Sequence, residues 1–274
     1  MTNRSKSLIF LASTLLVPAG CSMFDTARNE RLAYVARPVE QLYNEAADTL
    51  ARNNYDEAVL MFNEVERQHP YSEWASRANL MAAFAAYQSN DYDEAIAGAR
   101  RYISLHPGND ETAYAYYLIA ICYFERIVDV GRDQGTTEDA LSALNDVIRR
   151  YPDTEYAADA RLKVDMVRDQ LAGKEMEIGR WYLRRNQHLA AINRFKRVID
   201  EFETTSHTPE ALYRLTESYL SIGLKSEATK TAAVLGHNYP ATEWYADAYA
   251  LMSDNGTSLD TAPEGKRKKF LGIF

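Results

Sequence analysis

The sequence contains little cysteine, no excess of basic charge and no long apolar run, and each shortage narrows the classes of protein it can encode. Its 274 residues include two cysteines and carry a formal net charge of −8. An acidic chain lacks the basic face that duplex nucleic acid requires, so we expect no nucleic-acid binding. The apolar run near the start, from Leu8 to Val17, is shorter than the roughly 20 residues that a membrane-spanning helix needs.

The motifs of common catalytic and cofactor sites are also missing. The chain has no glycine-rich phosphate loop, no H-E-x-x-H motif and no G-x-S-x-G motif. Its five histidines do not cluster in the sequence. His69 and His106 each precede a proline of a repeated pattern, which favours a structural role over metal binding. We therefore expect no enzyme activity, no metal site and no cofactor.

The first residues resemble a bacterial lipoprotein signal. Arg4 and Lys6 precede the uncharged run, which is followed by small residues and then by Cys21. In such proteins the cysteine is acylated, so the resemblance implies a lipid anchor on Cys21 that attaches the chain to a membrane without spanning it. Ser22, where aspartate often marks retention in the inner membrane, implies the outer membrane. An ordinary signal peptide with an incidental cysteine is the alternative. If Cys21 is acylated, Cys122 has no disulfide partner, and its apolar surroundings indicate a core position.

One pattern of constant internal spacing occurs five times. In four copies an alanine is followed twelve residues later by proline, and in the remaining copy Glu203 takes the proline position; the alanines are Ala58, Ala95, Ala140, Ala191 and Ala228. Apolar residues four and seven positions after each alanine indicate an amphipathic helix that ends near the proline. Another helix fits into each gap between copies, because the alanines lie 37, 45, 51 and 37 residues apart.

Helix pairs with a small residue at the contact and a closing proline resemble the tetratricopeptide repeat. We expect an all-α tetratricopeptide-repeat solenoid of about five helix pairs, in which the first helix of each pair lines the concave side. The longest gap is expected to hold an extra helix, from Tyr156 to Leu171, before a helix from Lys174 to Arg185 opens the fourth pair. An unrelated helical bundle is the alternative.

The lipoprotein-like start and the repeats together divide the chain into four expected segments. We expect a signal peptide at residues 1–20, a lipid-anchored linker at 21–37, the repeat domain at 38–254 and a disordered basic tail at 255–274. The tail contains the basic cluster Lys266–Lys269 followed by apolar residues. This end either contacts anionic lipid or a partner, or is a solvated tail.

A lipidated start followed by five such repeats resembles the BamD family, lipoproteins of the β-barrel assembly machinery of Gram-negative outer membranes. The resemblance runs from Cys21 to Pro240, and the stretches that carry it are Arg67–Ser72, Tyr114–Phe124, Gly131–Asp133, Arg150–Tyr156 and Asn193–Arg194. It implies a non-enzymatic scaffold, lipid-anchored on the periplasmic face of the outer membrane, that helps to insert β-barrel proteins. Other Bam lipoproteins are implied as further partners.

The resemblance also implies two binding surfaces. The C-terminal repeats are expected to bind the periplasmic POTRA domain of BamA through Lys174, Glu175, Arg185 and Arg194. The N-terminal repeats are expected to hold the C-terminal signal of unfolded barrel proteins in a groove lined by Tyr43, Arg67, Tyr71, Trp74, Arg77 and Tyr87. A pilus-assembly lipoprotein, or pilotin, built of the same repeats is the alternative. An enzyme such as a peptidoglycan lyase would need a second domain.

Overall fold

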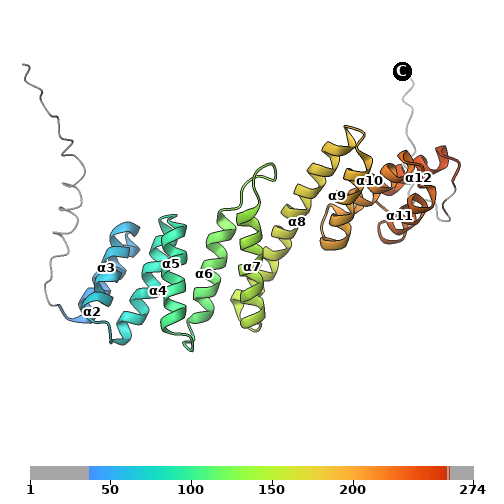
Figure 1. Ribbon diagram of the computed structural model, residues 1–274. Helices are drawn as coiled ribbons and strands as arrows, with labels where there is room; N and C mark the ends of the chain where they lie inside the picture. Colours follow the sequence, from blue (N-terminus) through green and yellow to red (C-terminus); the bar gives the residue numbers. More distant parts are fainter. Residues whose placement is uncertain (1–36, 258, 260–274) are drawn as a thin grey trace, which may run out of the picture. The chain divides into compact units, whose positions relative to one another are not determined.

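The computed structural model describes residues 37–257 and residue 259, and within these residues the chain forms helices and turns without a strand (Figure 1). The predicted signal peptide, Cys21, the linker up to residue 36 and the tail from residue 260 lie outside the described residues. The chain divides after Ala78 into two compact units, which are described separately. In the described residues, no helix has both the length and the apolar character that crossing a bilayer demands.

The first unit contains α2 (Val39–Ala51), α3 (Tyr55–Gln68) and the beginning of α4 (Glu73–Gln88). Helices α2 and α3 pack against each other as an antiparallel pair joined by a short turn. The buried apolar residues of this unit are Leu42, Ala46, Ala58, Val59, Phe62, Val65, Ala75 and Ala78. Their spacing of three and four residues gives each helix one apolar face, as the sequence predicts.

The second unit begins within α4 and continues through eight further helices. They are α5 (Tyr92–Leu105), α6 (Thr112–Glu125), α7 (Gly135–Arg150), α8 (Glu155–Leu183), α9 (His188–Glu201), α10 (Thr208–Ser221), α11 (Lys225–Asn238) and α12 (Glu243–Asp254). From α5 to α12, helices that follow one another in the chain pack together, with additional contacts between α6 and α8 and between α10 and α12. This is the contact pattern of stacked helix pairs, in which each pair buries its apolar face against its neighbours.

The alanine of every repeat copy is fully buried, which confirms the predicted frame. Ala58, Ala95, Ala140, Ala191 and Ala228 all have 0% exposure, and each lies on the second helix of a pair. Small residues on the facing helices allow the backbones to approach closely. At Gly179 on α8, a Cβ atom would overlap the ring of Phe195 on α9, and at Gly236 on α11 it would overlap the ring of Tyr245 on α12. The expected tetratricopeptide packing is therefore present.

The turn inside most pairs contains a residue with positive φ. Asn53, Asn90, Asn186 and Gly223 have φ values of 61°, 63°, 57° and 80°. In each turn the following residue donates its backbone N–H back to the last turn of the helix, as Gln187 does to the Tyr182 carbonyl at 3.0 Å. Asparagine and glycine tolerate this left-handed conformation best, and the motif satisfies carbonyls that the helix end leaves free. The α6–α7 connection departs from this pattern and uses a longer polar loop, as expected from the sequence.

Helix α8 differs from the expectation. The extra helix and the first helix of the fourth pair form one continuous helix of 29 residues, from Glu155 to Leu183. Gly173 lies in the middle of it without ending it, and His207 and Val130 approach that position so closely that they leave little room for a Cβ atom. The N-terminal half of α8 packs against α6 and α7, and its C-terminal half packs against α9.

Candidate functional site

The most organised group of charged side chains lies where the end of α8 meets α9. Glu175 on α8 has 7% exposure and is therefore a buried carboxylate. Its Oε2 accepts a hydrogen bond from Arg194 Nη1 at 3.0 Å, and its Oε1 accepts one from Arg197 Nη1 at 2.9 Å. Arg197 also donates from Nε to Glu201 at 3.0 Å, and these interactions raise its pKa, chiefly through the Glu201 bond. One buried carboxylate thus fixes two guanidinium groups of the neighbouring helix.

An open cleft of about 390 Å³ lies beside these two guanidinium groups. It is lined by Tyr182, Ala190, Asn193, Arg194 and Arg197. The arginine side chains are partly exposed, 36% for Arg194 and 45% for Arg197, whereas the carboxylate that holds them is not. A guanidinium group has five N–H donors, so each arginine retains donors beyond those used inside the protein. The cleft therefore presents positive charge to an approaching group.

Exposed apolar side chains lie near the turn between the two helices. Trp181 on α8 is 43% exposed and Leu189 on α9 is 70% exposed. The guanidinium carbon of Arg185 lies 3.6 Å from the centroid of the Trp181 ring, a close cation–π contact. Trp181 also meets Tyr182, a cleft residue, edge to face at 5.0 Å. We call the cleft, together with Glu175, Trp181, Arg185 and Leu189, the α8–α9 surface.

Of the four residues predicted to face BamA, the structure brings three near this surface in different roles. Arg194 lines the cleft, Arg185 stacks on the tryptophan, and Glu175 lies beneath and holds the arginine. Lys174 is half-buried at the neighbouring position on α8.

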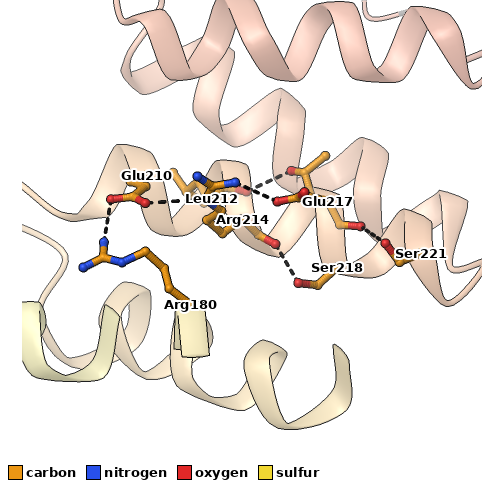
Figure 2. A network of polar contacts seen from close by, with 8 residues as sticks. Arg180, Glu210, Leu212, Arg214, Glu217, Ser218 and Ser221 are labelled. Carbon is orange, nitrogen blue, oxygen red and sulfur yellow. Dashed lines mark hydrogen bonds and ion pairs between the residues drawn. The ribbon is translucent and has the colours of Figure 1, made fainter. Parts of the chain in front are cut away.

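A polar network ties the end of α8 to the next helix pair, as Figure 2 shows. Arg180 Nη1 donates to Glu210 Oε2 on α10 at 2.9 Å, and Arg214 Nη1 donates to Glu217 Oε2 at 3.0 Å. Arg214 Nε also lies 3.5 Å from the second carboxylate oxygen of Glu210, and this contact joins the two ion pairs into one network. Since Arg180 directly precedes Trp181, this network anchors the helix end that carries the exposed tryptophan.

The first unit contains an aromatic cluster that includes three of the residues predicted for the client groove. Tyr43 on α2 lies 4.8 Å from Trp74 on α4 and 5.5 Å from Phe62, measured between ring centroids. The guanidinium carbon of the exposed Arg77 lies 5.8 Å from the centre of the Trp74 ring. Tyr43 and Trp74 are only half-buried, so the cluster keeps part of its aromatic surface open to solvent.

The other three predicted groove residues lie in different surroundings. Arg67 is held by the buried Glu64, which accepts from its Nε at 2.6 Å, and this pairing lowers the pKa of the Glu64 carboxyl. Tyr71 is fully exposed in the turn after α3. Tyr87 belongs to the second unit, where its ring packs near Phe84 at 6.5 Å and Tyr92 at 6.1 Å.

Sequence reasoning missed several residues of the α8–α9 surface. They are Trp181, Tyr182, Leu189, Ala190, Asn193 and Arg197. A signal for Arg197 was present, because it follows Arg194 by three residues and so shares its helix face. The link to Glu175 could not be predicted, since it joins residues 19 and 22 positions apart on different helices.

Comparison with protein families gives one clear relationship. Residues 35–235 match the model of the family YfiO, described as an outer membrane lipoprotein. The chain is 58% identical over 253 residues to the outer membrane protein assembly factor BamD of Caulobacter vibrioides. The aligned residues cover 92% of this chain and 83% of that protein. It is 46% identical to the BamD of Rickettsia prowazekii, over 80% of this chain and 88% of the relative. The BamD of Neisseria gonorrhoeae is 30% identical over 89% and 95% of the two chains.

Solved structures of tetratricopeptide-repeat proteins are similar at a lower level. The TPR2AB domain of yeast Sti1 is 12% identical, with a TM-score of 0.44, over 80% of this chain and 85% of that one. A tetratricopeptide-repeat protein of Thermus thermophilus is 20% identical, with a TM-score of 0.36, over 79% and 98% of the two chains.

Proposed function

Since the chain belongs to the BamD family of outer membrane protein assembly factors, we propose that it acts as a non-enzymatic scaffold with two binding surfaces. The α8–α9 surface binds the periplasmic POTRA domain of BamA. The aromatic cluster of the first unit receives the C-terminal segments of unfolded barrel proteins. Other Bam lipoproteins complete the assembly at the periplasmic face of the outer membrane. The BamD relatives favour this function over that of a pilus-assembly lipoprotein.

The observation that carries the BamA proposal is the pair of arginines held by one buried carboxylate. Arg194 and Arg197 are oriented before any partner arrives, so binding does not have to order two long side chains. A carboxylate of the partner that enters the cleft becomes desolvated against both guanidinium groups. Truncating an arginine in such an arrangement typically costs about 2 kcal/mol or more in binding free energy. Trp181 and Leu189 supply apolar contact at the border.

A titration with the purified POTRA domain tests this surface. We expect Arg194→Glu to weaken binding at least tenfold, because it replaces attraction by repulsion. Arg194→Gln, which places no second carboxylate beside Glu175, should weaken binding in the same direction. Lys196→Glu is the matched control, since this exposed lysine lies on the same helix and outside the cleft. Unchanged affinity of the Arg194 variant, or an equal loss in both variants, would refute the proposal.

For the client surface, the structure favours Arg77 over Arg67 as the contact for a terminal carboxylate. Arg67 is engaged by Glu64, whereas Arg77 is exposed and its guanidinium lies over the ring of Trp74. An aromatic residue at the end of a client can pack on Tyr43 and Trp74 while its carboxylate pairs with Arg77. This contact is small, so it suits transient binding to a client that passes on to BamA.

Photo-crosslinking tests the client surface. Crosslinkers placed singly within residues 39–90 should capture a peptide ending in phenylalanine more efficiently than the same peptide without that residue. Arg77→Gln should reduce this capture, while Arg132→Gln, at an exposed arginine of the α6–α7 loop, should not. Crosslinks confined to residues 154–240, or insensitive to the terminal aromatic residue, would contradict the assignment.

The lipid anchor on Cys21 forms part of the same proposal. One acyl chain gives only marginal membrane attachment, whereas two or more hold a protein stably at the surface. Cys21→Ala should therefore leave an uncleaved precursor or release the protein into the periplasm. Cell fractionation that finds the variant mature and still bound to the outer membrane would exclude an anchor at this residue.

A further inference from the structure

A fully exposed tyrosine lies in the turn between α3 and α4, and the proposed function does not use it. Tyr71 has a relative exposure of 102%, and its side chain makes no ring contact or hydrogen bond with any described residue. The repeat does not require an aromatic residue here, because the position after the closing proline is Gly108, Asp153 or Ala241 in the other copies. Tyr71 therefore contributes nothing to the packing of the repeat.

The turn that carries Tyr71 is held in place by its neighbours. The backbone N–H and the hydroxyl of Ser72 both donate to the His69 carbonyl oxygen, at 3.0 and 2.9 Å. The same hydroxyl accepts a hydrogen bond from the backbone N–H of Ala75, in the first turn of α4, at 3.1 Å. Pro70 fixes one further backbone dihedral angle. The ring is thus presented on a fixed support, and contact with it does not have to order the backbone.

This turn lies beside the residue at which the described chain begins. The Nε2 atom of His69 lies 2.8 Å from the Arg37 carbonyl oxygen, and the Arg37 backbone N–H donates to Gln68 Oε1 at 3.5 Å. Arg37 follows Cys21 by 16 residues, which span at most about 55 Å when fully extended. The opposite end of the helix pair, at the α2–α3 turn, is about 20 Å away, because α2 has 13 residues. The end that carries Tyr71 is therefore the end at which the segment from Cys21 enters the fold.

We propose that Tyr71 contacts the surface of the lipid bilayer, with its ring among the headgroups and its hydroxyl towards water, an inference that rests on the proposed anchor at Cys21. A lone protruding ring suits a lipid surface, which needs no complementary pocket, better than a protein, whose anchor residues lie in packed clusters. The contact does not depend on anionic lipid, because Arg67 is paired with Glu64 and the exposed Glu73 follows the turn. One ring adds little affinity, so its effect is to orient the first unit of a chain that the anchor already holds.

Fluorescence quenching on vesicles tests this orientation. The chain from Cys21 onward is coupled through the Cys21 thiol to a maleimide lipid in phosphatidylcholine vesicles, while the buried Cys122 stays unreacted. The fluorescent amino acid Anap replaces either Glu73, beside the turn, or Asp56, an exposed residue at the opposite end of the pair. Lipids with a nitroxide near the headgroup quench only nearby fluorophores. We expect them to lower the emission at position 73 by about twofold and to leave that at position 56 nearly unchanged.

Substitution of the tyrosine separates the effect of its ring from that of the probe. In the chain labelled at position 73, Tyr71→Ser should abolish the quenching and Tyr71→Trp should retain it. The inference is overturned if both probe positions are quenched equally or not at all, if Tyr71→Ser leaves the quenching unchanged, or if quenching requires added phosphatidylglycerol, which would indicate attraction by charge. Because chemical coupling takes the place of acylation, the result does not depend on whether cells acylate Cys21, so this test and the fractionation of Cys21→Ala can fail separately.

Discussion

Glu175 shows how the role of a residue depends on what it contacts. The family resemblance marks it as a contact for BamA, yet the structure places its carboxylate beneath the surface, between two arginines. From this position it can influence a partner only through Arg194 and Arg197. A buried carboxylate that accepts two charge-assisted hydrogen bonds contributes both stability and orientation. The two contributions can be separated by substitution.

We predict that Glu175→Ala weakens POTRA binding and lowers the free energy of unfolding by about 1–3 kcal/mol, because two guanidinium groups lose their buried acceptor. For Glu175→Gln, both the POTRA affinity and the free energy of unfolding should lie between those of Glu175→Ala and of the natural chain. Glutamine has the shape of glutamate but only one accepting oxygen. Glu177→Ala, at an exposed position of the same helix, is the control. The prediction fails if Glu175→Ala binds POTRA as tightly as the natural chain in calorimetry.

At the scale of helices and turns, the sequence predicts which segments are helical better than where each helix ends. The alanine frame locates the second helix of every pair, and in four of the five copies a closing proline marks its end, because burial and proline chemistry act locally. The continuity of α8 could not be predicted in this way. Gly173 suggests a break by its propensity, but the helix runs through it, at a position where His207 and Val130 leave little room for a larger residue.

The left-handed turn residues give a prediction for single turns. Asn186, between α8 and α9, has a φ of 57°, a conformation that β-branched residues adopt at a cost of about 1–2 kcal/mol. Asn186→Val should lower the unfolding free energy by that amount, while Asn186→Gly should leave it close to that of the natural chain. Urea denaturation of the two variants measures the difference. Asn145→Val, at an exposed helical position of α7, is the comparison that should show a much smaller loss.

On the scale of the whole chain, the excess of acidic residues makes stability sensitive to acid at particular carboxylates. Asp159 on α8 accepts a hydrogen bond from the Tyr117 hydroxyl at 2.5 Å and pairs with Lys163 at 3.0 Å. Chiefly through the Tyr117 bond, these contacts lower the pKa of the Asp159 carboxyl in the folded protein. A depressed folded pKa adds stability above the unfolded value, and this stability disappears as the pH falls through the folded value.

We therefore predict a specific pH dependence for Asp159→Asn. The variant should be less stable than the natural chain by a constant amount above about pH 5, since the unfolded aspartate has a pKa of about 3.9. The difference should shrink as the pH falls below about 4. Thermal unfolding at a series of pH values measures it. A difference that stays constant down to pH 2 would show that the Tyr117 and Lys163 contacts do not favour the ionised carboxylate.

The two candidate surfaces differ in how far the sequence could predict them. Tyr43, Trp74 and Arg77 lie together because they occupy neighbouring turns of packed helices, so an aromatic count over a short stretch was sufficient to find them. The α8–α9 surface instead depends on a pairing between helices and on the exposure of Trp181 and Leu189. Exposure of an apolar residue is a property of the fold, and no local pattern predicts it.

Because Cys122 is buried in α6, the rate at which its thiol reacts with a reagent can report how often that helix opens locally. Its side chain has 0% exposure, and burial raises the pKa of its thiol to about 12. In a chain whose other cysteine, Cys21, is replaced, it is the one thiol left. A thiol reagent can then react only in molecules where α6 has transiently opened, so the labelling rate under native conditions reports that opening. Labelling should be far slower in the native chain than in urea. If the POTRA domain slows the labelling of Cys122 further, then binding at the α8–α9 surface also stabilises α6 against local opening.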